Sequence, residues 1–272
     1  MKFTLTILFF FVYQFGLPQQ YDSVFIEEED IDSNNKTYKI GNVYIFDYEI
    51  IQSGEKYKLI QSKGMFKNRV FELAPFSADT IGLLQIHLIV KPVEDIERTN
   101  SNQTQISYLE SPYFESSSST GVVDNDKNVW IHPIRNGFFN SLETCPFPYV
   151  KLPLEIGSEW SDAMLIGEPW GDEKWGKWDG QLLLNYNYKI TGKSSIKTKI
   201  GQIECYVIES TAVSEIGETK LKSYFSTEFG FVRLEYNLIN DLNINFWLSD
   251  FMVGKEFNDT RTFFKTKEYI KH

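Results

Sequence analysis

The sequence predicts an all-β protein built on a strongly curved antiparallel sheet, either a half-barrel or two packed β lobes, with at most one or two short helices. Apolar and polar residues alternate with a period of two along most of the chain, and long stretches with a helical period are missing. Aromatic residues make up 16% of the 272 residues, a share that suits half-buried strands.

The first twenty residues have the pattern of a secretory signal peptide. Lys2 precedes an almost unbroken apolar run over residues 3–13, which ends before Gly16 and Pro18. A run of this length is typical of a signal peptide and is too short to span a membrane. No cysteine follows it, so a lipid anchor on an N-terminal Cys is not expected. We expect residues 1–20 to be removed, leaving a periplasmic or extracellular chain without a transmembrane segment.

The N-terminal half contains the next expected strands. Residues 44–50 alternate, a turn follows at Ser53 and Gly54, and residues 57–61 return as the second strand of a hairpin. Residues 84–90 are predicted to be a strand that ends before Pro92, with His87 pointing away from the apolar face and partly exposed. The alternative for residues 84–90 is a short helix capped by Asp79, and residues 136–143 are the only other helix candidate.

Two segments separate these strands from the rest. Residues 111–120 are a Ser-rich loop, and residues 145–153 are held extended by three prolines. The second segment is the better boundary, which predicts an N-terminal β lobe over residues 21–145 and a C-terminal antiparallel meander over residues 146–272. Export would permit a disulfide between Cys145 and Cys205, but Cys205 also fits a buried strand thiol, so the spacing leaves both states open.

The C-terminal part has the clearest alternation. Apolar residues share one face over residues 182–190, a turn is expected at residues 192–195, and a strand carries Cys205 to Ile208. Further strands are expected over residues 221–225, 232–238 and 242–248, with turns at residues 227–230 and at Asn240 and Asp241. This order predicts a meander of hairpins.

The segment over residues 157–180 is the main candidate for a binding site. Four tryptophans, Trp160, Trp170, Trp175 and Trp178, alternate there with acidic residues. Indole rings beside carboxylates are typical of a sugar-binding face, and two carboxylates at the proper separation would also suit a glycosidase. The alternative is that these rings pack in the core, as buried tryptophans do.

Other chemistry finds little support in the sequence. Residues 124–128 are interpreted as a hairpin turn, because Val129 and Arg135 replace the Gly and Glu that a calcium loop requires. His132 has no nucleophile motif to accompany it and is interpreted as structural. No metal-ligand spacing, phosphate loop or dinucleotide motif is present, so no metal, cofactor or catalytic residue is expected. The net charge of −10 makes nucleic acid an unsuitable partner, and the acidic run at residues 27–30 is interpreted as a solvated arm.

The C-terminal meander resembles a group of exported proteins of Gram-negative bacteria, especially the Bacteroidetes. The resemblance rests on Gly157 with Trp160, on the strand over residues 201–208 and on the motif over residues 224–232. It implies a domain like the curved half-barrel of periplasmic lipoprotein carriers, in which the sheet cups an apolar ligand. It carries over no functional residue, and the first half of the chain has no counterpart in it.

These observations lead to three hypotheses about function. The first is a non-catalytic envelope protein that binds an apolar or amphiphilic ligand, such as a lipid, on the concave aromatic face of the sheet. The second is a carbohydrate-binding protein or glycosidase that uses residues 157–180 to hold a glycan. The third is a structural envelope protein without a ligand.

Overall fold

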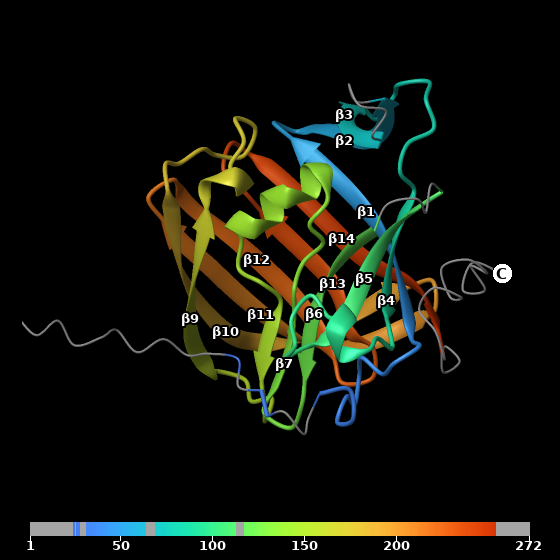
Figure 1. The fold of residues 1–272 in the computed structure, drawn as a ribbon, viewed down its shortest axis with the longest axis vertical. Coiled ribbons are helices and arrows are strands. Elements are labelled where there is room, and N and C mark those ends of the chain that lie inside the picture. Colours follow the sequence, from blue (N-terminus) through green and yellow to red (C-terminus); the bar gives the residue numbers. More distant parts are fainter. Residues whose placement is uncertain (1–23, 25, 28–30, 64–68, 113–116, 254–272) are drawn as a thin grey trace, which may run out of the picture.

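The computed structural model describes residues 24, 26–27, 31–63, 69–112 and 117–253. Within them, 14 strands form one sheet that curls strongly around its own inner face (Figure 1). Neighbouring strands are antiparallel throughout this described part. The structure therefore confirms the predicted all-β class and the strongly curved antiparallel sheet. The expected signal peptide, residues 1–20, and residues 28–30 of the acidic run lie outside the described residues.

The elements follow one another in a simple order along the chain. They are β1 (Val43–Gln52), β2 (Glu55–Lys63), β3 (Arg69–Pro75), β4 (Gln85–Val90), η2 (Asp95–Glu97), β5 (Thr104–Ser111), β6 (Ser117–Asp124), β7 (Asn128–Ile131), η3 (Gly137–Thr144), β8 (Tyr149–Lys151), β9 (Glu159–Gly167), η4 (Glu168–Trp170), β10 (Gln181–Thr198), β11 (Gly201–Ser214), β12 (Gly217–Ser226), β13 (Gly230–Asn237) and β14 (Leu242–Met252). The three η elements are 3₁₀ helices.

The order of strands across the sheet is β8-β7-β6-β5-β4-β1-β14-β13-β12-β11-β10-β9, with β2 and β3 branching from β1. The central junction joins β1 to β14, from Val43 opposite Met252 to Gln52 opposite Leu242. Strands from the beginning and the end of the chain thus lie side by side in the same sheet. The expected lobe boundary between residues 145 and 146 falls between η3 and β8, and a division into folding units there stays a prediction.

The inner face of the curl is the hydrophobic core. Alternate side chains of β10, from Leu182 to Ile190, are buried as their spacing predicts. The helix expected near residues 136–143 is present as η3, which lies across the concave face (Figure 1). Its Phe139 is fully buried, with its ring centroid 5.4 Å from that of Phe246 on β14 and 5.9 Å from that of Tyr48 on β1.

Two predictions about local structure are wrong. No turn occurs at residues 192–195, because β10 continues to Thr198 and absorbs the glycine in a β-bulge between Ile190 and Gly192. His87 is 2% exposed rather than partly exposed. Its strand lies inside the sheet, and its cross-strand neighbours Ile45 and Leu109 are buried as well.

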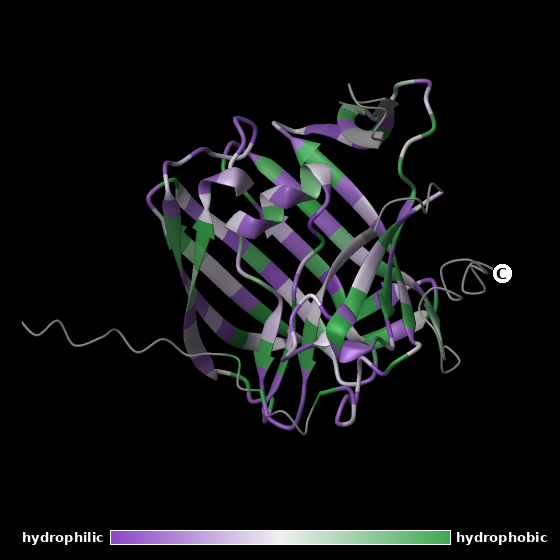
Figure 2. Cartoon of the chain, in the orientation of Figure 1, coloured by the Kyte–Doolittle hydropathy of each residue, from purple (hydrophilic) through white to green (hydrophobic). Residues whose placement is uncertain are grey.

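The Ser-rich loop is shorter than expected. Residues 117–120 of the segment belong to β6, where their backbone pairs with β5, and residues 113–116 lie outside the described residues. The turn expected over residues 124–128 is present between β6 and β7. Hydropathy drawn on the ribbon shows the alternation along the long strands (Figure 2). Among the described residues, no helix combines the length and apolarity needed to cross a membrane.

Candidate functional site

The concave face is filled by its own side chains. Under η3 a cavity of about 20 Å³ remains, which is room for about one water molecule. Its lining is almost entirely apolar and comes from β1, β4, β5, β7, η3, β13, β14 and the segment before η3: Phe46, Ile86, Leu88, Tyr108, Ile131, Pro133, Ile134, Leu142, Leu234, Tyr236 and Phe246. The aromatic interior expected from the sequence is present, but as packed core.

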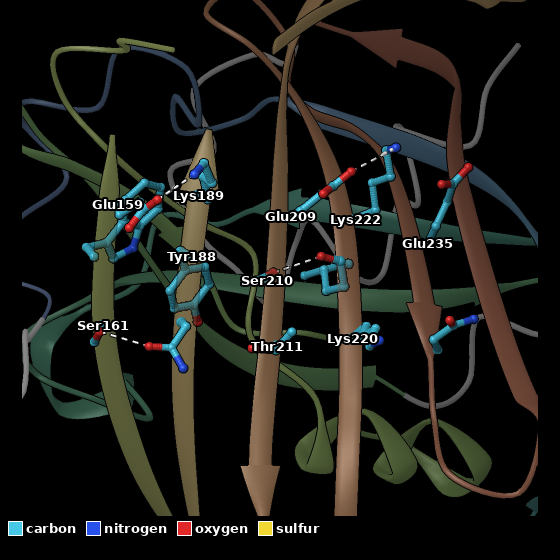
Figure 3. A pocket seen from close by; sticks show the side chains of 14 residues that line it. Glu159, Ser161, Tyr188, Lys189, Glu209, Ser210, Thr211, Lys220, Lys222 and Glu235 are labelled. Atoms are coloured by element: carbon cyan, nitrogen blue, oxygen red, sulfur yellow. Dashed lines mark hydrogen bonds and ion pairs between the residues drawn. The ribbon is translucent and has the colours of Figure 1, made fainter. Parts of the chain in front are cut away.

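The large open space lies on the opposite face of the sheet. A hollow of about 730 Å³ crosses β9 to β13, and we call it the outer hollow (Figure 3). This volume is within the range of small-ligand sites. Its outward side chains are polar and alternate along each strand with buried ones: Glu159, Ser161, Asn187, Lys189, Glu209, Thr211, Lys220, Lys222, Glu235 and Asn237.

One row of the outer hollow alternates in charge. Glu159, Lys189, Glu209, Lys222 and Glu235 stand opposite one another in register across five strands. Two ion pairs form within the row. Lys189 contacts Glu159 at 2.6 Å, and Lys222 contacts Glu209 at 3.2 Å. Hydrogen bonding to these glutamates raises the pKa of both lysines. The charges are therefore compensated within the protein itself.

A second row beside it is mostly uncharged. Ser161, Asn187, Thr211, Lys220 and Asn237 again stand in register across β9 to β13. The Ser161 hydroxyl donates to the Asn187 side-chain oxygen at 3.1 Å. Hydroxyl and amide groups in such a row offer both donors and acceptors to a ligand.

Two irregularities in the strands lie beside the outer hollow. One bulge is on β10, where Thr191 is the extra residue between Ile190 and Gly192, and the other is on β13, where Val232 is the extra residue opposite Tyr224 and Phe225. A bulge bends its strand and increases the local twist. Both bulged strands, β10 and β13, contribute side chains to the outer hollow, so the bulges add local twist to this part of the curl.

Trp160, the first of the four candidate tryptophans, packs on the core side of β9. Its ring is 6% exposed and stacks on Tyr188, with centroids 5.3 Å apart and an angle of 3° between the rings. Tyr149 on β8 contacts both rings edge-on. These aromatic contacts join β8 to β9, the two outer edges of the curled sheet.

The other three tryptophans lie around η4. Trp175 and Trp178 are 6% and 8% exposed, and Trp170 is half-buried. The Trp175 indole donates to the Trp170 carbonyl oxygen at 3.0 Å and its ring meets Phe138 of η3 edge-on. The four rings thus form no common exposed face, and ligand binding by any of them stays a prediction.

His132 belongs to a buried polar cluster beside η3. Its Nδ1 donates to the Pro133 carbonyl oxygen at 2.8 Å, and its Nε2 accepts from Arg135. The nearest carboxylate oxygen, Glu143 Oε1, is 3.6 Å from Nε2 and 3.1 Å from Arg135 Nε. The guanidinium also lies over the Trp170 ring, 5.0 Å from its centroid. Both imidazole nitrogens are thus engaged within the fold, which agrees with a structural His132.

Burial dominates the titration of this cluster. It lowers the pKa of His132 to about 3, with a further contribution from the charge of Arg135. It raises the pKa of Glu143 to about 7, although Arg135 acts in the opposite direction. The imidazole is therefore neutral at physiological pH, and the cluster contains no group positioned as a nucleophile.

The two cysteines are both free and buried. Burial raises the pKa of each thiol to about 12. Within the described residues, no group of three or more His, Cys, Asp or Glu side chains has the arrangement of a metal site.

The sequence identified parts of the outer hollow without assembling them. Alternation with apolar neighbours predicts that Asn187, Lys189, Glu235 and Asn237 point away from the core. Their common site depends on the register of five strands, which side-chain alternation alone does not specify.

Comparisons with known proteins give similarities of fold. No protein-family model and no curated protein sequence matches the chain. A "putative lipoprotein" of Parabacteroides distasonis matches with a TM-score of 0.40 and 12% identity, over 79% of this chain and 97% of its own. A "putative exported protein with YmcC-like fold" of Bacteroides fragilis matches with a TM-score of 0.45 and 10% identity, over 80% and 99%.

The hypothetical lipoprotein YmcC of Escherichia coli matches with a TM-score of 0.35 and 10% identity, over 76% of this chain and 84% of its own. Proteins described as exported or as lipoproteins, including two from the Bacteroidetes, are thus among the structures that this chain is similar to, in line with the resemblance seen in its sequence. At these identities and TM-scores the similarities assign neither a ligand nor an activity to this chain.

Proposed function

We propose that the protein is a non-catalytic binding protein of the cell envelope that holds a neutral, hydroxyl-rich ligand, a carbohydrate, in the outer hollow. The observation that carries this proposal is the contrast between the two faces of the sheet. The outer hollow has a volume of about 730 Å³, whereas the cavity on the inner face has about 20 Å³.

The lining of the outer hollow supports an uncharged ligand. It contains three glutamates and three lysines, so the local formal charge is zero in a chain whose net charge is −10. A strongly charged ligand would have to break ion pairs that the protein already satisfies. Sugar hydroxyls both donate and accept, so they suit Asn187, Thr211 and the paired charges equally well.

The apolar or amphiphilic ligand expected from the sequence receives less support. An acyl chain on the concave face would have to displace η3, whose Phe138, Phe139 and Leu142 are buried there. Moving these three side chains into water would forfeit about 2 kcal/mol each. A lipid is therefore the second candidate ligand, and the experiment below includes it.

The paired charges also favour binding over catalysis. A glycosidase needs two carboxyl groups that flank the scissile bond, one of them protonated. In the outer hollow Glu159 and Glu209 each contact a lysine, at 2.6 and 3.2 Å, and Glu235 contacts Arg233 at 2.6 Å.

Export is supported by the leader-like pattern of residues 1–20.

Calorimetric titration with neutral oligosaccharides tests the proposal. The probes are malto-, cello- and N-acetylglucosamine oligomers, and a fluorescent fatty acid tests the lipid alternative. For a series that binds, Asn187→Ala with Thr211→Val should lower the affinity about thirtyfold, because each of the two lost hydrogen bonds costs about 1 kcal/mol. Lys197→Ala, an exposed change on β10 outside the outer hollow, should bind like the wild type.

Two results would contradict the proposal. One is the absence of binding to every oligosaccharide series at millimolar concentration. The other is fatty-acid binding that the Asn187→Ala, Thr211→Val variant leaves unchanged, which would place the ligand on the inner face.

A further inference from the structure

A third row of side chains borders the outer hollow. Tyr224 on β12, Arg233 on β13 and Trp247 on β14 stand opposite one another in register. Tyr224 lies two residues along its strand from Lys222, and Arg233 lies two residues from Glu235. The new row is therefore about 7 Å from the row of alternating charges that contains Lys222 and Glu235. All three side chains are half-buried and point to the outer face, because they alternate with buried neighbours.

The row is held in place by contacts with the outer hollow. The Arg233 guanidinium lies over the Tyr224 ring, 5.8 Å from its centroid, and its Nη2 contacts Glu235 Oε1 at 2.6 Å. The Tyr224 hydroxyl donates to Glu235 Oε2 at 3.3 Å. Glu235 thus belongs to both features, and it positions the ring and the cation relative to the hollow.

We propose that Tyr224, Arg233 and Trp247 form an aromatic subsite that takes a further ring of the same oligosaccharide. This inference rests on the proposed function and extends it, because it assigns the ligand as a linear chain of at least two sugar rings. A pyranose presents C–H groups on its faces and hydroxyls at its edge. The two aromatic rings supply surfaces for the faces, and Arg233 supplies fixed N–H donors for the hydroxyls.

The position of the row explains why a chain is required. A monosaccharide can occupy the outer hollow without reaching Trp247, which is separated from Lys222 by β13 and lies one row further along the strands. A longer ligand can contact both features at once. Once the first ring is bound, the second ring binds without paying the translational entropy cost again. The affinity should therefore rise with the length of the oligosaccharide.

The experiment is a titration of the binding series with oligomers of one to six units. Wild-type affinity should increase with length and then level off. Tyr224→Ala with Trp247→Ala should leave the affinity for the monosaccharide unchanged and should lower the affinity for long oligomers about tenfold, and Trp247→Phe should retain most of the gain. If the double variant does not fold, each single alanine variant should show the same length-dependent loss, about threefold.

The failures of the two proposals are distinguishable. Equal losses for short and long oligomers, or a wild-type affinity that does not depend on length, would overturn the aromatic subsite and leave the outer hollow as the binding site. No binding of any oligomer by the wild type would overturn the proposed function, and the subsite with it.

Discussion

Tyr38 and Gly230 meet at the turn between β12 and β13, where the residues before β1 pack against the C-terminal strands. The buried Tyr38 hydroxyl accepts a hydrogen bond from the Phe231 backbone N–H at 3.0 Å. A Cβ atom at Gly230 would lie 2.4 Å from that hydroxyl oxygen. The tyrosine ring is confined by Tyr44, whose centroid is 5.1 Å away, so the ring has little freedom to retreat.

Gly230→Ala should therefore destabilise the protein by about 3 kcal/mol, as the sum of backbone strain and overpacking. Gly180→Ala is the matched control. The two glycines have φ values of +70° and +69°, but nothing lies within 4 Å of a Cβ at Gly180. The control should cost about 1 kcal/mol of strain alone. Urea unfolding measures both, and equal losses would show that the Tyr38 contact does not matter.

Trp175→Ala should destabilise the fold by about 4 kcal/mol, because its ring is buried against Phe138 of η3. Trp170→Ala should cost less, about 2 kcal/mol, because that ring is only half-buried where it packs against the core and Arg135. Thermal unfolding of the two variants measures the difference. A Trp175→Ala variant as stable as the wild type would show that its ring is not part of the core, and would make it available as a ligand contact.

His132 and Glu143 should oppose each other in the pH dependence of stability. The pKa of His132 is lowered to about 3 in the fold, so unfolding takes up a proton and stability rises between about pH 3 and 6.5. The pKa of Glu143 is raised to about 7, so unfolding releases a proton and stability falls between about pH 4.5 and 7. The two effects therefore cancel in large part between pH 4.5 and 6.5.

Single variants should separate these effects. In Glu143→Gln only the His132 effect remains, so the free energy of unfolding should rise with pH between pH 4.5 and 6.5 relative to the wild type. In His132→Asn only the Glu143 effect remains, so it should fall. Each change is at most about 1.4 kcal/mol per pH unit. Denaturant unfolding from pH 4 to 8 measures the slopes. Parallel curves for the wild type and both variants would contradict the assigned burial of the cluster.

Cys145 and Cys205 should be inert in the folded protein. Burial raises the pKa of both thiols to about 12, and the thiolate is the reactive form. A chromogenic thiol reagent at pH 8 should modify neither cysteine in the native state and both in urea without reductant. Finding no thiols in urea would instead demonstrate a disulfide.

Side-chain alternation predicted most of the C-terminal meander. Residues 182–190 form half of β10, and their apolar side chains are buried on its inner face, as their alternation with polar residues predicts. The same pattern missed the continuation of β10 beyond Gly192, because a glycine between two strand segments is equally suited to a turn and to a bulge. Which of the two forms depends on the pairing with β11, a partner that the local sequence does not reveal.

The candidate site was less accessible to the sequence. The tryptophans drew attention by composition, yet their large rings mainly fill the interior, as Trp160 does on Tyr188. The outer hollow is assembled from ordinary polar residues such as Asn187 and Lys222, which are conspicuous only when five strands align them. A site of this kind depends on register and twist, so it appears only in three dimensions.

The pairing of β1 with β14 sets a constraint on how the molecule is made. The two strands are separated by nearly the whole described chain, with Val43 opposite Met252. While the chain folds, one side of β1 stays without its hydrogen-bonding neighbour until β14 is available to pair with it. Contacts of such long sequence separation form slowly, and exposed strand edges attract other chains meanwhile. A chaperone that shields the waiting edge should therefore raise the yield of native protein more than one that assists the local hairpins.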